Sequence, residues 1–261
     1  MIAHAMVIIT EEQVAGFHRD GYIVVHDLLS RTAVETLRAA HDELLRRWAS
    51  ECSCSIDDYT RVVSQWTGLW KQHPVFHGHI HRPALAAIAR QLLGATHVQL
   101  FHDHLISKPP RHSATIPWHQ DYPFWPVDKP RALSCWVALD DATAASGALR
   151  FMPGAHRHGE QPPIDFLRAN KQWGPDESMA VDVEVRAGSA IFHDCLSWHM
   201  SPPNTTAAQR RAIITIVMDG DCRWHKARSS WHPMNAYVRV ADGERFNSDE
   251  FPLLGAAGGA S

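Results

Sequence analysis

The second half of the chain constrains the fold most, because its apolar residues occur in short runs separated by turn-forming residues. Pairs such as Pro109-Pro110 and Pro153-Gly154 mark the turns. No long helical pattern lies between the runs, so they favour an antiparallel sandwich or jelly roll over a parallel α/β sheet. The predicted strands cover residues 97–107, 133–139, 148–152, 181–185, 190–193 and 210–218.

The first part of the chain predicts three helices and one short strand. Thr10 opens a capping box, so the first helix begins there. A second helix follows a cap at Ser30 or Thr32, and a third covers residues 81–93. A β-branched run at residues 22–25 predicts a strand between the first two helices. We expect the helices to pack on the outside of one sheet.

No Pro-, Gly- or Ser-rich stretch divides the 261 residues, so we expect one domain that spans residues 1–261. Residues 165–178 are irregular and predict a loop or a short helix over the barrel. The expected parts are a helical outer layer mostly at residues 10–94, a jelly-roll core at about residues 97–220, and a C-terminal lid or tail at residues 221–261.

Charge and composition narrow the class of partner. The formal net charge of −3 gives no general attraction to nucleic acid or to an anionic membrane. No run of about 18 apolar residues indicates a transmembrane helix. Five cysteines do not suggest a disulfide scaffold and favour a reducing cytoplasm. We therefore expect a cytoplasmic protein that binds neither nucleic acid nor a membrane, and nothing indicates an obligate protein partner.

The first chemical motif is His119-Gln120-Asp121. In an extended chain, side chains two residues apart point the same way, so His119 and Asp121 would share one face. An imidazole beside a carboxylate is half of a site for a divalent transition metal. A second histidine would complete the facial arrangement typical of non-haem Fe(II) oxygenases. The motif is weak by itself, because the chain has 19 histidines and chance pairings are common.

His199 is the candidate for the third ligand, because it precedes a turn and then a strand that begins at Arg210. We expect this strand to run back beside His199. An arginine at the inner end of an apolar strand is costly to bury unless it pairs with an anion. The distal carboxylate of 2-oxoglutarate is the natural anion beside such an iron site. The alternative is that Arg210 is a surface residue at the start of a strand.

The order and spacing of these segments resemble the phytanoyl-CoA dioxygenase family of Fe(II)/2-oxoglutarate oxygenases. The resemblance extends from about residue 11 to residue 218. It implies a double-stranded β-helix (a cupin-like jelly roll) with N-terminal helices packed on one sheet. The matching segments are residues 17–25, 105–110, 118–121, 136–141, 146–149, 152–156 and 199–205, with Arg210 eleven residues after His199.

The resemblance also implies the metal ligands and the reaction. His119, Asp121 and His199 would bind Fe(II), and O2 and 2-oxoglutarate would be consumed with release of succinate and CO2. The expected outcome is hydroxylation of an unactivated C–H bond in a small molecule. The protein would contribute positioning and exclusion of water, so we expect no catalytic residue beyond the metal ligands.

The resemblance further implies where the cosubstrate binds. Arg210 and Ser201 would hold the distal carboxylate of 2-oxoglutarate. Trp136 and His104 would line the rest of that pocket.

The residues near the motifs suggest a substrate site. Aromatic side chains can shield an iron centre and stack on a flat or apolar substrate. The histidine- and tryptophan-rich segment from Cys222 to Tyr237 could form a lid. No basic cluster marks a coenzyme A pocket, so a small natural product or small acid is the expected substrate. The candidate substrate residues are Trp125, Phe124, His102, Lys108 and Trp224.

Other functions remain open at the level of sequence. The same iron chemistry could end in epimerisation, cyclisation or desaturation. A non-catalytic jelly-roll binding protein and a zinc hydrolase are further alternatives, although the hydrolase would leave Arg210 and Ser201 unexplained. Cys52 and Cys54 could hold a metal, and Ser197 with His199 could supply a nucleophile and a base; both are weak signals, because no supporting motif accompanies them.

Overall fold

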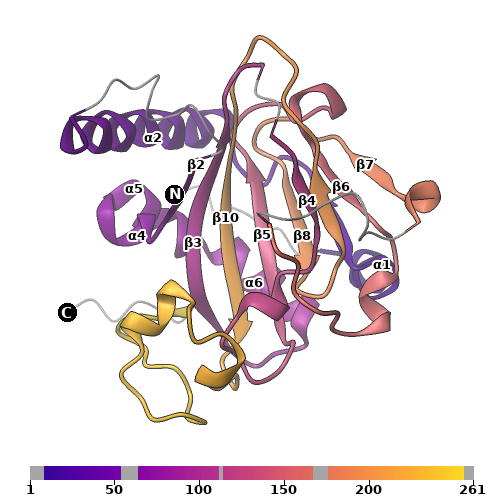
Figure 1. Cartoon of the computed structure of the whole chain (residues 1–261), viewed down its shortest axis with the longest axis vertical. Helices are drawn as coiled ribbons and strands as arrows, with labels where there is room; N and C mark the ends of the chain where they lie inside the picture. Colours follow the sequence, from indigo (N-terminus) through magenta and orange to yellow (C-terminus); the bar gives the residue numbers. More distant parts are fainter. Residues whose placement is uncertain (1–8, 54–63, 112–113, 167–175, 256–261) are drawn as a thin grey trace, which may run out of the picture.

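The computed structural model describes residues 9–53, 64–111, 114–166 and 176–255, and it contains two antiparallel β-sheets that enclose an apolar core (Figure 1). The strands of the larger sheet are β1 (Tyr22–Val25), β2 (Ser64–Thr67), β3 (Val98–Lys108), β5 (Ala132–Ala138), β8 (Ala190–Asp194), β10 (Arg210–Asp219) and β11 (Leu253–Leu254). Those of the smaller sheet are β4 (Ile116–His119), β6 (Leu149–Phe151), β7 (Val181–Val183) and β9 (His199–Ser201).

The strand order explains how distant segments meet. The larger sheet runs β1-β8-β5-β10-β3-β11, with β2 paired to β3, and the smaller sheet runs β4-β9-β6-β7. The predicted mainly β, jelly-roll fold class is confirmed, and the two sheets do not close into a barrel.

The helices cover the outer face of the larger sheet, as the sequence predicts (Figure 1). Leu44 of the second helix and Ile88 of the last one belong to the same core cluster as Ile213 of β10. The next residue, Ile214, belongs to the cluster between the sheets, as the two-residue period of a strand requires. The helices are α1 (Glu11–Asp20), α2 (Arg31–Glu51), α4 (Leu69–Gln72), α5 (Pro74–Ile80) and α6 (Pro83–Leu93).

The short elements differ from the prediction. The sequence pattern did not indicate β2, α4, α5 or β11, which are each seven residues or fewer. The third predicted helix begins at Pro83 rather than at residue 81, because Arg82 is extended and serves as its N-cap. Of residues 165–178, the stretch 167–175 lies outside the described residues, and Glu177–Met179 forms one turn of 3₁₀ helix. Among the helices of the described residues, none has the length and apolarity to cross a membrane.

Gly188 joins the helical layer to the larger sheet. Its carbonyl accepts a hydrogen bond of 2.9 Å from the Leu29 N–H, and its own N–H donates to the Ala138 carbonyl at 2.8 Å. Its φ is +92°, and a Cβ at this position would lie 2.6 Å from the Leu29 carbonyl oxygen. Both the backbone conformation and the space therefore require glycine.

We predict that Gly188→Ala lowers the free energy of unfolding by about 3 kcal/mol, because it adds a clash with backbone to a strained φ. Gly68→Ala is the matched control, since Gly68 also has a positive φ (+72°) but nothing lies within 4 Å of an added Cβ. It should cost about 1 kcal/mol. Urea denaturation measures both, and equal losses would contradict the packing role of Gly188.

Candidate metal centre

Two histidines and one aspartate meet between the sheets. His119 ends β4 and His199 begins β9, and these two residues are paired across the strands. Asp121 follows His119 by two residues. Each of the three side chains offers one ligand atom, and these three atoms lie within 4.8 Å of one another. This is the donor set and the compactness that a divalent transition metal requires.

The distances place one carboxylate oxygen opposite both imidazoles. Asp121 Oδ1 lies 3.7 Å from His119 Nε2 and 3.9 Å from His199 Nε2. Nδ1 of His119 is 2.8 Å from the Pro117 carbonyl, and Nδ1 of His199 is 3.0 Å from the Ser197 carbonyl. Carbonyls only accept, so both Nδ1 atoms carry the proton. The lone pairs of both Nε2 atoms are therefore available to a metal.

The other oxygen of Asp121 is held by two residues that the sequence did not single out. Ser134 of β5 donates a hydrogen bond of 2.8 Å to Oδ2, and Nε2 of His193 lies 3.3 Å from the same atom. Ser134 and His193 are register partners on β5 and β8. The two-residue period of a strand could have predicted that Ser134 and His193 face inward. Only the pairing of β5 with β8 shows that both reach the carboxylate of Asp121.

Burial and mutual contact set the charge of the cluster. Burial lowers the pKa of His119 to about 4, with a further lowering by His199. Burial likewise lowers the pKa of His199 to about 4. Burial raises the pKa of Asp121, but the imidazoles of His199 and His193 outweigh it and hold that pKa below the usual range. Near neutral pH the centre thus offers two neutral imidazoles and one carboxylate, the protonation state in which all three bind metal.

Two details of the sequence interpretation need correction. The extended chain ends at His119, and Asp121 has helical dihedrals (φ −77°, ψ −45°) at the start of a 3₁₀ turn. The two side chains converge because the Asp121 N–H is held by the Cys195 carbonyl at 3.1 Å, not because both lie on a strand. Similarly, β10 does not run beside His199, since β9 and β10 belong to different sheets.

Arg210 lies inside the cavity rather than on the surface. Its side chain is fully buried, and its Nη2 donates to the Gly147 carbonyl at 3.0 Å and to Ser201 Oγ at 3.1 Å. Nε and Nη1 are buried without a hydrogen-bond partner among the described residues. The guanidinium carbon is 5.4 Å from the centre of the Trp136 ring. Burial lowers the pKa of Arg210 to about 10, so the group stays charged and fits an incoming carboxylate.

A cavity of about 840 Å³ contains both the histidine–aspartate cluster and Arg210. Five further residues predicted for the cosubstrate or substrate line it together with Ser201. They are Trp136, His104, His102, Phe124 and Trp125. Residues that the predicted site did not include complete the wall, among them Thr67, Phe166, His193, Trp231, His232 and Met234. The last three belong to the histidine- and tryptophan-rich segment that the sequence suggests as a lid.

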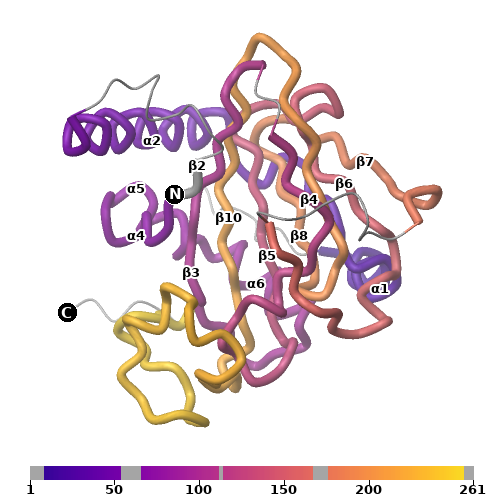
Figure 2. The backbone as a smooth tube through the Cα atoms, in the orientation of Figure 1, coloured from indigo at the N-terminus to yellow at the C-terminus, as the bar shows by residue number. Residues whose placement is uncertain are grey.

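Two predicted substrate residues do not line the cavity. The buried amine of Lys108 donates to the carbonyls of Ser201 and Pro202, so it closes the turn after β9 instead of facing a substrate. Figure 2 shows this turn beside the end of β3. Nε1 of Trp224 donates a hydrogen bond of 2.8 Å to Asn235 Oδ1, which links two parts of the C-terminal segment.

The alternative sites gain no support. Ser197 Oγ donates to the Gly21 carbonyl at 2.7 Å, and the His199 ring contacts the Ser197 backbone rather than its hydroxyl. Cys54 lies outside the described residues, and Cys52 is exposed.

We predict that His193→Phe and Ser134→Ala each weaken binding of Mn(II), an EPR-visible substitute for Fe(II), by about 10- to 100-fold. Loss of either contact lets the Asp121 carboxylate turn away from the imidazoles. His156→Phe is the control, because His156 Nε2 contacts the His18 carbonyl at 3.2 Å and not Asp121. If both variants bind Mn(II) as tightly as the His156→Phe protein, the two residues do not position Asp121.

Acid should destabilise the metal-free protein between pH 6.5 and about 4. His104, His119, His199 and His232 each have a folded pKa of about 4, lowered chiefly by burial from 6.5. In this window the unfolded chain binds more protons, so the free energy of unfolding falls as the pH falls. Each histidine contributes about 1.4 kcal/mol per pH unit. His104→Leu should reduce the slope, measured by urea denaturation, by about that amount; an unchanged slope would contradict this.

Comparison with known proteins shows the family of the chain. The sequence model of the phytanoyl-CoA dioxygenase family (PhyH) matches residues 17–212. An ectoine dioxygenase from Sphingopyxis alaskensis is 31% identical over 231 residues, which cover 80% of this chain and 75% of the relative.

Solved structures share the fold. One is SnoK, a non-haem α-ketoglutarate-dependent carbocyclase from nogalamycin biosynthesis. Its superposition has a TM-score of 0.77 at 23% sequence identity and covers 94% of this chain and 96% of the SnoK chain. EctD from S. alaskensis, solved with 2-oxoglutarate and 5-hydroxyectoine, has a TM-score of 0.72 at 25% identity and covers 91% and 86%. With the family match over most of its length, the chain belongs to the phytanoyl-CoA dioxygenase family.

Proposed function

We propose that the protein is an Fe(II)- and 2-oxoglutarate-dependent oxygenase that hydroxylates an unactivated C–H bond of a small molecule and releases succinate and CO2. One observation carries the proposal. A two-histidine, one-carboxylate cluster faces the same cavity as a buried guanidinium, two of whose nitrogens have no hydrogen-bond partner in the described part of the chain. A zinc hydrolase would need the cluster but has no use for the guanidinium.

His119, Asp121 and His199 would hold the iron through Nε2, Oδ1 and Nε2. When bound, the iron supplies the chemistry that activates O2 with electrons from 2-oxoglutarate. Ser134 and His193 keep the other Asp121 oxygen engaged, so the carboxylate presents one oxygen to the metal. With three protein ligands, the centre would have room for the cosubstrate and O2 as well.

Arg210 would receive the distal carboxylate of 2-oxoglutarate. Its two unpartnered nitrogens can form a forked pair of hydrogen bonds with a carboxylate. Ser201 and Gly147 fix the third nitrogen, so the guanidinium is oriented before the cosubstrate arrives. Trp136 lies against the same guanidinium, and His104 lines the same cavity.

The rest of the cavity would orient the substrate and exclude water. Trp125 is buried in its wall. We assign no general acid or base, because the reaction needs a positioned C–H bond and a dry site more than proton transfer from a side chain. Product analysis by mass spectrometry distinguishes hydroxylation, a gain of one oxygen atom, from epimerisation, cyclisation or desaturation.

The test is the visible charge-transfer band that forms when Fe(II) binds 2-oxoglutarate in the absence of O2. We expect the native protein to show the band and Asp121→Ala to lose it. Arg210→Met should raise the 2-oxoglutarate concentration needed for half the band by about 100- to 1,000-fold, because a buried ion pair is lost.

Arg211→Met provides the matched control. Arg211 follows Arg210 on β10 but points to the outer face, where it binds Asp140 at 2.8 Å and Asp42 at 3.1 Å. We expect it to lower stability and leave the affinity for 2-oxoglutarate unchanged. An unchanged band in Asp121→Ala, or equal losses in Arg210→Met and Arg211→Met, would overturn the assignment.

A further inference from the structure

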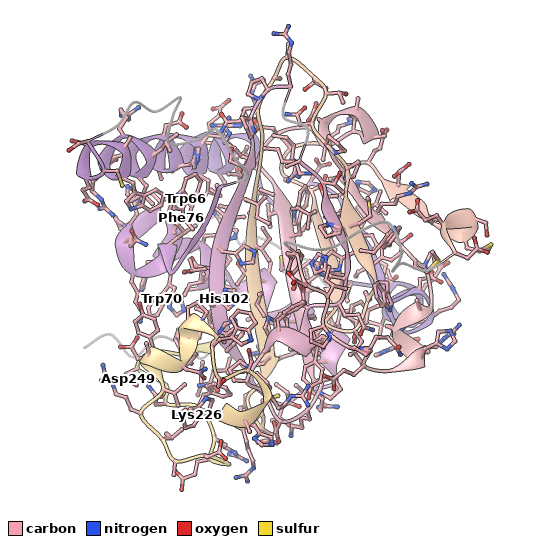
Figure 3. All side chains as sticks on the ribbon, in the orientation of Figure 1. Trp66, Trp70, Phe76, His102, Lys226 and Asp249 are labelled. Atoms are coloured by element: carbon pink, nitrogen blue, oxygen red, sulfur yellow. The ribbon has the colours of Figure 1, made fainter. Side chains whose placement is uncertain are left out.

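Two imidazoles, those of His102 and His232, line the cavity at a distance from Arg210, and His102 lies beside His104 with ring centres 5.3 Å apart. His102 lies on β3 opposite Ile216 of β10, whereas Arg210 begins β10 opposite Lys108. Six residues of strand separate these points, about 20 Å. His232 of the C-terminal segment faces His102, with ring centres 5.8 Å apart. Figure 3 labels His102 beside β3, next to that segment. This end of the cavity therefore lies away from the guanidinium that would receive the distal carboxylate of 2-oxoglutarate.

Both imidazoles present an N–H donor. Nδ1 of His232 accepts a hydrogen bond from the Met234 N–H at 3.2 Å, so its proton lies on Nε2. Nδ1 of His102 is buried and forms no hydrogen bond with the described residues. The Nε2-protonated form of His102 is thus favoured. Burial lowers the pKa of His232 to about 4 and that of His102 well below its usual value, so both rings are neutral.

The cavity offers no spare charge to a substrate. Histidines apart, Asp121 and Arg210 are the only acidic and basic side chains among the described residues that line it, and their charges cancel. The two charges of a ferrous ion and the two of 2-oxoglutarate cancel as well. A charged substrate would therefore enter a closed site without a counter-ion, which is unfavourable.

Aromatic rings surround the opening. The Phe124 ring lies 5.2 Å from that of Phe166 and 6.3 Å from that of Trp231. Phe166 and Trp231 are 47% and 67% exposed, although large aromatic side chains gain stability from burial. Exposed rings beside a cavity of about 840 Å³ provide faces on which a flat ligand can stack.

We propose that the substrate is an uncharged, flat molecule of at least two fused rings, whose carbonyl or hydroxyl oxygen accepts hydrogen bonds from His102 and His232. This rests on the proposed function, because the charge balance assumes bound iron and 2-oxoglutarate. The sequence analysis expected a small natural product or a small acid, and this proposal narrows the substrate to an uncharged natural product.

Three probes of one shape test the proposal: 2-acetonaphthone (neutral), 2-naphthoate (anion) and 2-naphthylmethylammonium (cation). Binding is measured by isothermal titration calorimetry to protein loaded with Fe(II) and 2-oxoglutarate without O2, after the charge-transfer band is seen. We expect the ketone to bind at least tenfold more tightly than either ion. A protein that shows the band but binds the ketone no better than an ion, or not at all, overturns this inference and leaves the proposed function intact. Absence of the band overturns the proposed function.

Matched variants locate the binding groups. His232→Phe and His102→Phe keep a ring but remove the donor, so each should weaken ketone binding at least fivefold. His225→Phe, an exposed histidine of the same segment, should have no effect. A loss no larger than that in His225→Phe would overturn the role of the two imidazoles.

A gain of function tests the charge argument. Thr67 is exposed at the edge of the cavity and pairs with His104. Thr67→Lys should improve 2-naphthoate binding by about two- to fivefold, the usual strength of a partly exposed ion pair. An unchanged ratio of naphthoate to ketone affinity would show that missing charge does not set the selectivity.

Discussion

The half-buried carboxylate of Asp121 forms the contacts on which the rest of the site depends. A carboxylate in an apolar interior is stable only if both oxygens are engaged. Oδ2 takes a hydrogen bond from Ser134 and faces His193, while Oδ1 faces the imidazoles of His119 and His199. Both sheets are needed for these contacts, because β5 and β8 carry Ser134 and His193, and β4 and β9 carry His119 and His199.

The buried guanidinium of Arg210 is the second constraint. It lies on the larger sheet, whereas both histidine ligands lie on the smaller sheet. The smaller sheet contributes the two histidine ligands, and the larger sheet contributes the guanidinium and the residues that hold Asp121. A buried cation costs stability when two of its nitrogens, here Nε and Nη1 of Arg210, have no hydrogen-bond partner within the described ranges. A ligand that supplies a carboxylate removes this penalty, so binding of cosubstrate should be coupled to stability. The helical layer stabilises the outer face of the same sheet and leaves the inner face for chemistry.

Part of this arrangement was predictable from the sequence. The structure brings His119, Asp121 and His199 together and places Arg210 in the same cavity. The sequence could indicate them because they lie in segments with defined spacing, and their binding of iron and cosubstrate stays a prediction. His193 and Ser134 were missed because their role depends on the register of β5 against β8, and pairing between distant strands leaves no local signal.

Lys108 shows a different limit of sequence reasoning. The strand period correctly places it on the same face as His102 and His104. However, the turn after β9 closes over its amine, which donates to backbone carbonyls. The short elements α4, α5 and β2 were missed because a few residues do not establish a hydrophobic period.

A crystal structure of the protein with Fe(II) and 2-oxoglutarate, grown without O2, tests the central claim most directly. Anomalous scattering at the iron edge should give one peak bound by His119 Nε2, His199 Nε2 and Asp121 Oδ1, with the distal carboxylate of 2-oxoglutarate on Arg210. An iron peak away from these three atoms, or a distal carboxylate that does not contact Arg210, would contradict the account.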